Sequence, residues 1–180
     1  MAGAGGGIGD LVHRPQVAAL DWRWIRVHCR QRRAAVLVGA DEVLWKYGIP
    51  HQACRDGFFA LHKRLAELFR DLTVARADGS IGQLLLKLSR IDVLVLDDFA
   101  MAPLKDSERR DFLEICDDRY QRRSTILTSQ MPVAHWHEQI GDPSVADSIM
   151  DRLIHKCYRI ELNGESMRKK RGRKPDPDSQ

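Results

Sequence analysis

The sequence lacks several features that would assign a protein quickly to a functional class. Its four cysteines, Cys29, Cys54, Cys116 and Cys157, are scattered, with no C-x-x-C pair and no clustered histidines. That spacing disfavours a zinc site and is typical of reduced thiols in the cytoplasm. No apolar run approaches the ~20 residues that a membrane-spanning helix needs, and no secretory leader is evident. We therefore expect a cytoplasmic protein without a membrane anchor.

A phosphate-binding loop of the form G-x-x-x-x-G-K-[ST] is also absent. The glycine-rich residues 1–10 follow no strand and precede no lysine, so we interpret them as a flexible terminus. Residues 34–39 (AAVLVG) have the composition of a buried strand, but Asp41 and Glu42 follow them and would repel a triphosphate. Lys46 comes one position too late for the motif, and no Ser or Thr follows it. The sequence therefore predicts poor binding of nucleotide phosphates.

The surplus of positive charge lies at the two ends of the chain. The 180 residues are 43% hydrophobic and 30% charged, which suits one globular domain, and the net charge is +4. Residues 22–33 interleave two tryptophans with five arginines, a pattern that either binds nucleic acid or has no partner. We expect a disordered basic tail at the other end, able to contact DNA phosphates without reading sequence. Its cations are Arg168, Lys169, Lys170, Arg171, Arg173 and Lys174.

The strongest functional signal is residues 91–98 (IDVLVLDD), an apolar run that ends in two acids. The run does not alternate, which predicts a strand buried on both faces, as in a parallel sheet covered by helices. Such sheets bind ligands at the carboxyl ends of their strands. In a nucleotide hydrolase, Asp97 would hold Mg²⁺ and Asp98 would polarise the attacking water. The alternative is a core strand that runs into a solvated turn.

The remaining pattern alternates strands with helices. Helical faces occur over residues 65–72 and 81–88, and a third helix extends to Tyr120, with its charged residues expected on a solvated face. Further strands are expected at 58–62, 125–129 and 157–162. This order predicts an α/β fold, a mostly parallel sheet with helices on both faces. We expect this core over residues 51–167, between a divergent segment, 1–50, and the tail, 168–180.

Six segments in this order resemble one known family: HQACRDG, LDDFAMAPL, ERRDF, RRSTILTSQ, HEQIGDP and ESMRKK. The chain is similar to IstB-like proteins, the AAA+ ATP-binding helpers of IS21-type transposable elements, which are close to replicative helicase loaders. The resemblance extends from about His51 to Lys170, and the residues before His51 do not share it. It implies a P-loop NTPase fold of the AAA+ type.

The resemblance also implies site residues and partners. Asp97 would bind the Mg²⁺ of ATP, and Asp98 would act in hydrolysis. Thr128, Ser129 and Gln130 are the candidates for the polar sensor that orients water near the γ-phosphate; otherwise they merely close a strand. Arg152 matches the position of an arginine finger, or else forms a surface ion pair. The implied partners are DNA, the transposase of the same element and further copies of the chain.

Two functions remain open at this point. The first is an ATPase helper of transposition, with a helicase-loader-like ATPase as its nearest variant. The second is a non-hydrolysing remnant or adaptor that keeps contacts with DNA or a transposase. Because the resemblance stops abruptly where the phosphate loop should be, a changed reading frame upstream of His51 is a further hypothesis.

Overall fold

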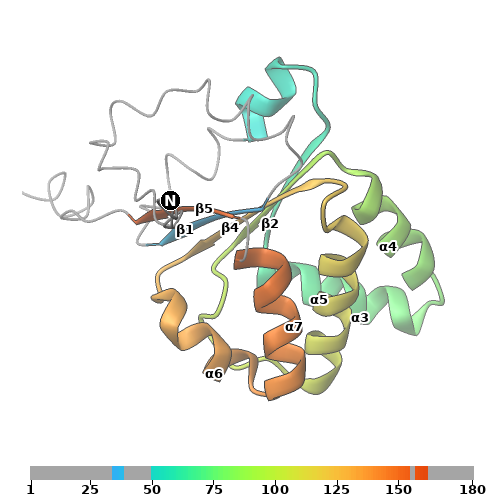
Figure 1. The fold of residues 1–180 in the computed structure, drawn as a ribbon. Coiled ribbons are helices and arrows are strands. Elements are labelled where there is room, and N and C mark those ends of the chain that lie inside the picture. Colours follow the sequence, from blue (N-terminus) through green and yellow to red (C-terminus); the bar gives the residue numbers. More distant parts are fainter. Residues whose placement is uncertain (1–33, 39–49, 155–156, 162–180) are drawn as a thin grey trace, which may run out of the picture.

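The computed structural model describes residues 34–38, 50–154 and 157–161 (Figure 1). Most of the expected divergent segment, including its glycine-rich start and its tryptophan–arginine stretch, lies outside the described residues. The residues directly after position 38 and the basic tail with its six cations also lie outside them.

The described residues form five strands and several helices in alternation. The strands are β1 (Ala34–Val38), β2 (Ala60–Arg64), β3 (Val93–Asp97), β4 (Ser124–Ser129) and β5 (Tyr158–Glu161). The helices are α3 (Leu65–Ala77), α4 (Ile81–Arg90), α5 (Asp106–Arg119), a short 3-10 helix (Val133–His135), α6 (Trp136–Ile140) and α7 (Pro143–Ile154). Residues 50–55 are also helical. None of the described helices is both long and apolar enough to cross a membrane.

All five strands are parallel, in the order β2-β3-β4-β1-β5. This confirms the predicted parallel α/β fold. Strand β3 lies between β2 and β4, and every one of its residues is buried, as its uninterrupted apolar sequence predicts. The strand expected at 34–39 is confirmed as β1, which lies between β4 and β5 in the sheet although it precedes the expected core boundary at residue 51.

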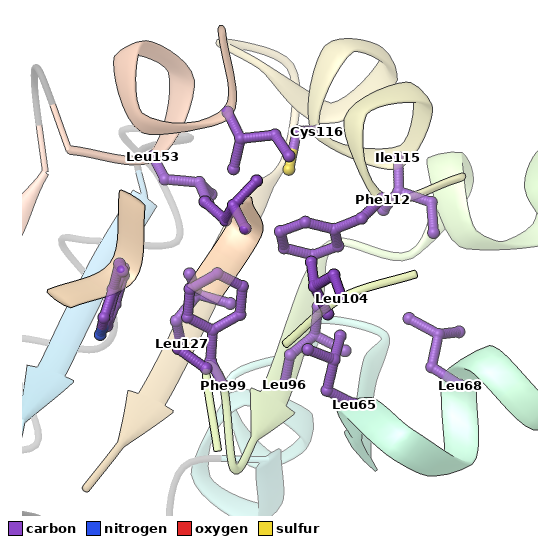
Figure 2. Close-up of a cluster of buried hydrophobic side chains, with 14 of the residues drawn as sticks. Leu65, Leu68, Leu96, Phe99, Leu104, Phe112, Ile115, Cys116, Leu127 and Leu153 are labelled. Carbon is purple, nitrogen blue, oxygen red and sulfur yellow. The ribbon is translucent and has the colours of Figure 1, made fainter. Parts of the chain in front are cut away.

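The sheet buries apolar side chains on both faces. Helices α3 to α7 cover one face, and the helical residues 50–55 lie on the other (Figure 1). On the first face, Phe112 from α5 and Leu153 from α7 pack over Leu96 and Leu127 of the central strands (Figure 2). The second face carries a smaller cluster, formed by Ala35, Leu37, Ala53, Val93, Val95 and Ile126. Helices on both faces were predicted, and the structure confirms them.

Two expectations are corrected. Strand β2 begins at Ala60, two residues later than predicted, and Phe59 is 78% exposed. The predicted start was wrong because β2 is a half-buried edge strand, whose sequence shows little apolar pattern. The charged residues of α5 were expected on a solvated face, but Asp111 is 9% exposed and Arg119 is 1% exposed. Burial of Arg119 is possible because backbone carbonyls accept hydrogen bonds from its guanidinium group.

Candidate nucleotide site

The carboxyl ends of the central strands bring the predicted site residues together. Asp97 is the last residue of β3, whose Leu96 pairs with Leu127 of β4. Thr128 and Ser129 therefore end β4 beside Asp97, and Ser129 also pairs with Val38, the last residue of β1. Because parallel strands end at the same edge of a sheet, these residues share the edge where open α/β sheets bind ligands.

Asp97 is held from two sides. The Thr128 hydroxyl donates a hydrogen bond to Oδ1 of Asp97. Its other oxygen, Oδ2, lies 3.7 Å from Nε2 of His62 on β2, beyond hydrogen-bond distance. Burial by itself would raise the pKa of Asp97, but the His62 ring, the Thr128 hydroxyl and the backbone N–H of Asp98 outweigh it and lower that pKa. Asp97 is therefore a carboxylate at neutral pH, although it is only 7% exposed.

Asp98 begins a tight turn away from the sheet. Its φ is +60°, and Ala100 has the same φ, a left-handed backbone conformation that is costly for residues other than glycine. The turn directs the Asp98 carboxylate toward Arg64 at the end of β2, with 3.7 Å between Oδ2 and Nε. The two acids are thus adjacent in sequence but face different basic groups.

Ser129 stabilises this turn rather than contacting Asp97. Its hydroxyl donates a hydrogen bond of 2.6 Å to the carbonyl of Phe99 and accepts one of 3.0 Å from the N–H of Met131. The Phe99 N–H donates in turn to the carbonyl of Thr128, at 2.9 Å. Gln130, the third sensor candidate, follows directly and is exposed. The side chain of Thr128 is the sensor candidate that is seen hydrogen-bonded to Asp97.

His62 is a site residue that sequence reasoning missed. Its Nε2 is buried and has no hydrogen-bond partner in the described part of the chain. The sequence carried no signal for it, because the folded sheet sets the register that pairs His62 with Val95, two residues before Asp97.

The side-chain oxygens at this edge fit the metal-binding part of a magnesium–nucleotide site. Mg²⁺ prefers oxygen ligands and is typically held by one or two carboxylates together with substrate phosphates. Oδ2 of Asp97 accepts no hydrogen bond from His62 at its distance of 3.7 Å, so it can contribute to such a site. The Thr128 hydroxyl lies beside the other oxygen. Asp97 and Thr128 therefore suit the metal side of the site.

The phosphate side depends on the loop after β1. In a P-loop protein, the loop after such a strand supplies backbone N–H groups and a lysine to the phosphates. Here β1 ends at Val38, and the sequence continues as GADEVLWK over residues 39–46. These residues lie outside the described part of the chain, but their order does not match the motif. Strand β1 therefore lies where a P-loop protein has the strand before its phosphate loop, but the sequence that follows β1 is not that of a phosphate loop.

Arg152 lies near the amino edge of the sheet, where the strands begin. On α7, its Nε donates to the Asp117 carboxylate, and one of its terminal nitrogens donates to the carbonyl of Ser148 at 2.7 Å. Asp117 lies near the carboxyl end of α5, which leads to the start of β4. A strand of this length separates the two edges by roughly 13 Å. Arg152 therefore does not join Asp97 within one copy of the chain.

Comparison with known proteins identifies close relatives. The family described as IstB-like ATP binding protein matches residues 29–175. The match begins before His51 and includes β1, so the expectation that the resemblance starts at His51 was wrong. An insertion sequence ATP-binding protein of Sinorhizobium fredii is 50% identical over 124 residues, covering 69% of this chain and 51% of the relative. A second protein of that description from the same organism is 41% identical over 150 residues, covering 82% and 59%. The chain thus spans about half the length of these curated relatives.

Solved structures share the fold at low sequence identity. DnaI aligns with a TM-score of 0.67 and 19% identity, covering 78% of this chain and 82% of that one. The DnaC helicase loader aligns with a TM-score of 0.58 and 21% identity, covering 77% and 86%. DnaA bound to AMPPCP and single-stranded DNA aligns with a TM-score of 0.63 and 15% identity, covering 78% of this chain and 44% of that one. These likenesses support an AAA+ type of P-loop fold.

Proposed function

Because the chain belongs to the IstB-like ATP-binding protein family, we propose that it is a transposition helper of an insertion sequence whose nucleotide site is impaired. The observation that carries this proposal is the contrast between two neighbouring strand ends. Strand β3 ends in Asp97, beside Thr128, whereas β1 ends at the same edge and is followed by a sequence without a phosphate loop. The chain keeps the metal half of the site and lacks the phosphate half.

Each remaining side chain has a role in the proposed site. ATP with Mg²⁺, when bound, supplies the phosphoanhydride to be cleaved and the cation that neutralises it. Asp97 would hold the cation, Asp98 would polarise the attacking water, and Thr128 would fix the Asp97 carboxylate. Arg152 would serve only toward a neighbouring copy, after leaving Asp117. Without loop amides and lysine on the β- and γ-phosphates, these groups would act on a poorly held substrate.

The second candidate is a non-hydrolysing adaptor. It is favoured by Asp41 and Glu42, whose charges oppose a triphosphate after β1. Such an adaptor would keep contacts with DNA, through the tail cations, and with the transposase of the same element. A helicase-loader-like ATPase is the remaining alternative, which the similar folds of DnaI and DnaC support. In each case the frame hypothesis predicts a G-x-x-x-x-G-K-[ST] in another reading frame upstream of His51.

Three substitutions test the proposal directly. Leu44→Gly, Trp45→Lys and Lys46→Ser together convert residues 39–46 into G-x-x-x-x-G-K-S. If the missing loop is the impairment, this variant gains ATP affinity by about 100-fold or more, the equivalent of two charge-assisted hydrogen bonds. Equilibrium titration with fluorescent ATP and Mg²⁺ measures it.

The matched control keeps the glycine but omits the lysine. It carries Leu44→Gly, Trp45→Ala and Lys46→Ser, and it is expected to gain far less. Equal, weak binding by all three proteins would show that the carboxyl-edge site itself is incompetent. Tight binding by the unmodified chain would contradict the proposed impairment.

A further inference from the structure

An exposed apolar groove lies at the amino edge of the sheet, opposite the candidate nucleotide site. Its apolar residues are Phe59, directly before β2, Leu86 on α4, and Ile91, between α4 and β3. Phe59 is 78% exposed and Leu86 is 50% exposed. The groove has a volume of about 480 Å³. Large apolar side chains gathered in one exposed groove mark interaction sites, whereas single exposed ones are ordinary.

Cationic side chains border this groove. Lys87 and Arg90, both exposed, line it together with Gln83. Neither cation forms an ion pair within the part of the chain that the structure describes. A neighbouring groove shares Leu86 and adds Arg122, together with Arg123 and a single acid, Asp118. Arg123 is already paired with Asp92, and Asp71 and Asp78 line the groove on the other side of Lys87. Lys87 and Arg90 are therefore the cations that border the apolar groove without an ion pair among the described residues.

The backbone beneath the groove is held in place. The Phe59 N–H donates to the Asp92 carboxylate at 3.1 Å, which fixes the chain before β2. Arg119 donates to the carbonyl of Ile91 at 2.8 Å and to that of Leu88, which fixes the end of α4. A surface that is rigid before binding loses less conformational entropy when a partner docks.

We propose that this groove docks a segment of a partner protein that presents a large apolar side chain flanked by aspartate or glutamate. Phe59 and Leu86 would receive the apolar side chain, and Lys87 and Arg90 would pair with the carboxylates. Buried aromatic anchors with surrounding arginines are typical of protein interfaces. The inference goes beyond the proposed function, because docking here needs neither ATP nor the basic tail.

Other occupants fit the groove less well. Its floor holds one aromatic ring among aliphatic side chains, which is poor for nucleic-acid bases because they stack on successive aromatic rings. The chain's own ends, residues 1–33 and 162–180, are both rich in basic residues and would be repelled by the cations. An acidic and apolar segment of another protein would match both the apolar side chains of the groove and the cations that border it.

A peptide selection identifies what the groove binds. A random peptide display library is selected on the immobilised full chain and depleted on the Phe59→Ser variant. We expect the enriched peptides to combine a bulky apolar residue with Asp or Glu. Basic consensus sequences, or no enrichment over the depleted pool, would overturn the proposal.

Binding measurements on the enriched peptide then locate the site. Phe59→Ser, and separately Lys87→Glu with Arg90→Glu, should each weaken binding at least about tenfold, measured by fluorescence anisotropy. Met101→Ser is the matched control, because Met101 is 53% exposed and lies outside this groove and the two grooves beside it, and it should leave affinity unchanged. Circular dichroism confirms that the variants are folded. Equal affinity in all variants would overturn the proposal.

Two further measurements distinguish the other occupants. Affinity for single-stranded oligothymidine should be the same for the parent chain and for Phe59→Ser, and so should the sedimentation coefficient. A loss of oligothymidine binding in the variant would assign the groove to nucleic acid and overturn the proposal. A change from dimer to monomer in the variant would show that the groove binds a second copy of this chain, and it would also overturn the proposal.

Discussion

The two edges of the sheet use their polar side chains in different ways. At the amino edge, Arg119 donates to the carbonyls of Leu88, Ile91 and Ser124 and to the hydroxyl of Thr125. One side chain of α5 therefore holds the end of α4 and the start of β4. At the carboxyl edge, Thr128 and Asp97 contact each other, and the His62 Nε2 has no hydrogen-bond partner among the described residues.

The polar side chains of the amino edge therefore serve the stability of the fold, and those of the carboxyl edge are available for ligand binding. A polar group whose partners are backbone carbonyls is fully used by the fold, because removing it strands buried acceptors. A carboxylate at the end of a buried strand, with one oxygen beyond hydrogen-bond distance of the nearest basic group, is available to a ligand. Substitutions should therefore cost most stability at the amino edge and least at the carboxyl edge.

The largest expected effect is at Arg119. Burial lowers its pKa to about 10, so the guanidinium remains charged at neutral pH and donates to the surrounding carbonyls. Arg119→Met would leave those carbonyls without their donor and should cost roughly 3–5 kcal/mol of unfolding free energy. Arg122→Met, at an exposed position three residues later, should change it by less than about 0.5 kcal/mol. Urea unfolding measures both, and similar losses would contradict the assignment.

Asp92, also at the amino edge, should have a moderate effect. Its carboxylate accepts from the Phe59 N–H at 3.1 Å and lies 3.6 Å from a terminal nitrogen of Arg123. Asp92→Ala should lower the unfolding free energy by roughly 1–2 kcal/mol, since one hydrogen bond to a charged group and one partly buried ion pair are lost. A change within the error of urea unfolding would show that this edge is less tightly held than the contacts indicate.

At the carboxyl edge, Asp97→Asn should cost about 1 kcal/mol or less at neutral pH. The pKa of Asp97 is lowered in the folded protein, so its ionised form stabilises the fold above about pH 4. That contribution is lost as the pH falls through the lowered pKa. The variant should therefore lose less stability on acidification than the parent does, as unfolding curves at neutral and acidic pH can show. Parallel pH dependences would contradict the shift.

The basic tail should affect DNA binding and not stability. Truncation after Met167 removes all six tail cations. If all of them contact duplex phosphates, the slope of log K against log salt falls in magnitude by about 5. The urea midpoint of the truncated chain should equal that of the parent. An unchanged slope would remove the tail from the proposed DNA contacts.

Apolar pattern predicted the fold better than charge predicted the site. The uninterrupted run before Asp97 identified β3, and AAVLV identified β1, because a strand buried on both faces leaves an unambiguous sequence. Arg119 and His62 were missed, since their roles depend on partners distant in sequence that only the folded chain brings near. The start of β2 was missed because an edge strand has no such pattern.

We propose that the chain retains the acid-bearing strand β3 and lacks the loop that would hold a triphosphate. Equilibrium titration of the unmodified protein with labelled ATP and Mg²⁺, alongside Asp97→Ala, tests it most directly. The account predicts no saturable binding in the micromolar range and no difference between the two proteins. Micromolar binding by the parent that disappears in Asp97→Ala would contradict it, because a working phosphate loop would then have to lie in the residues after β1.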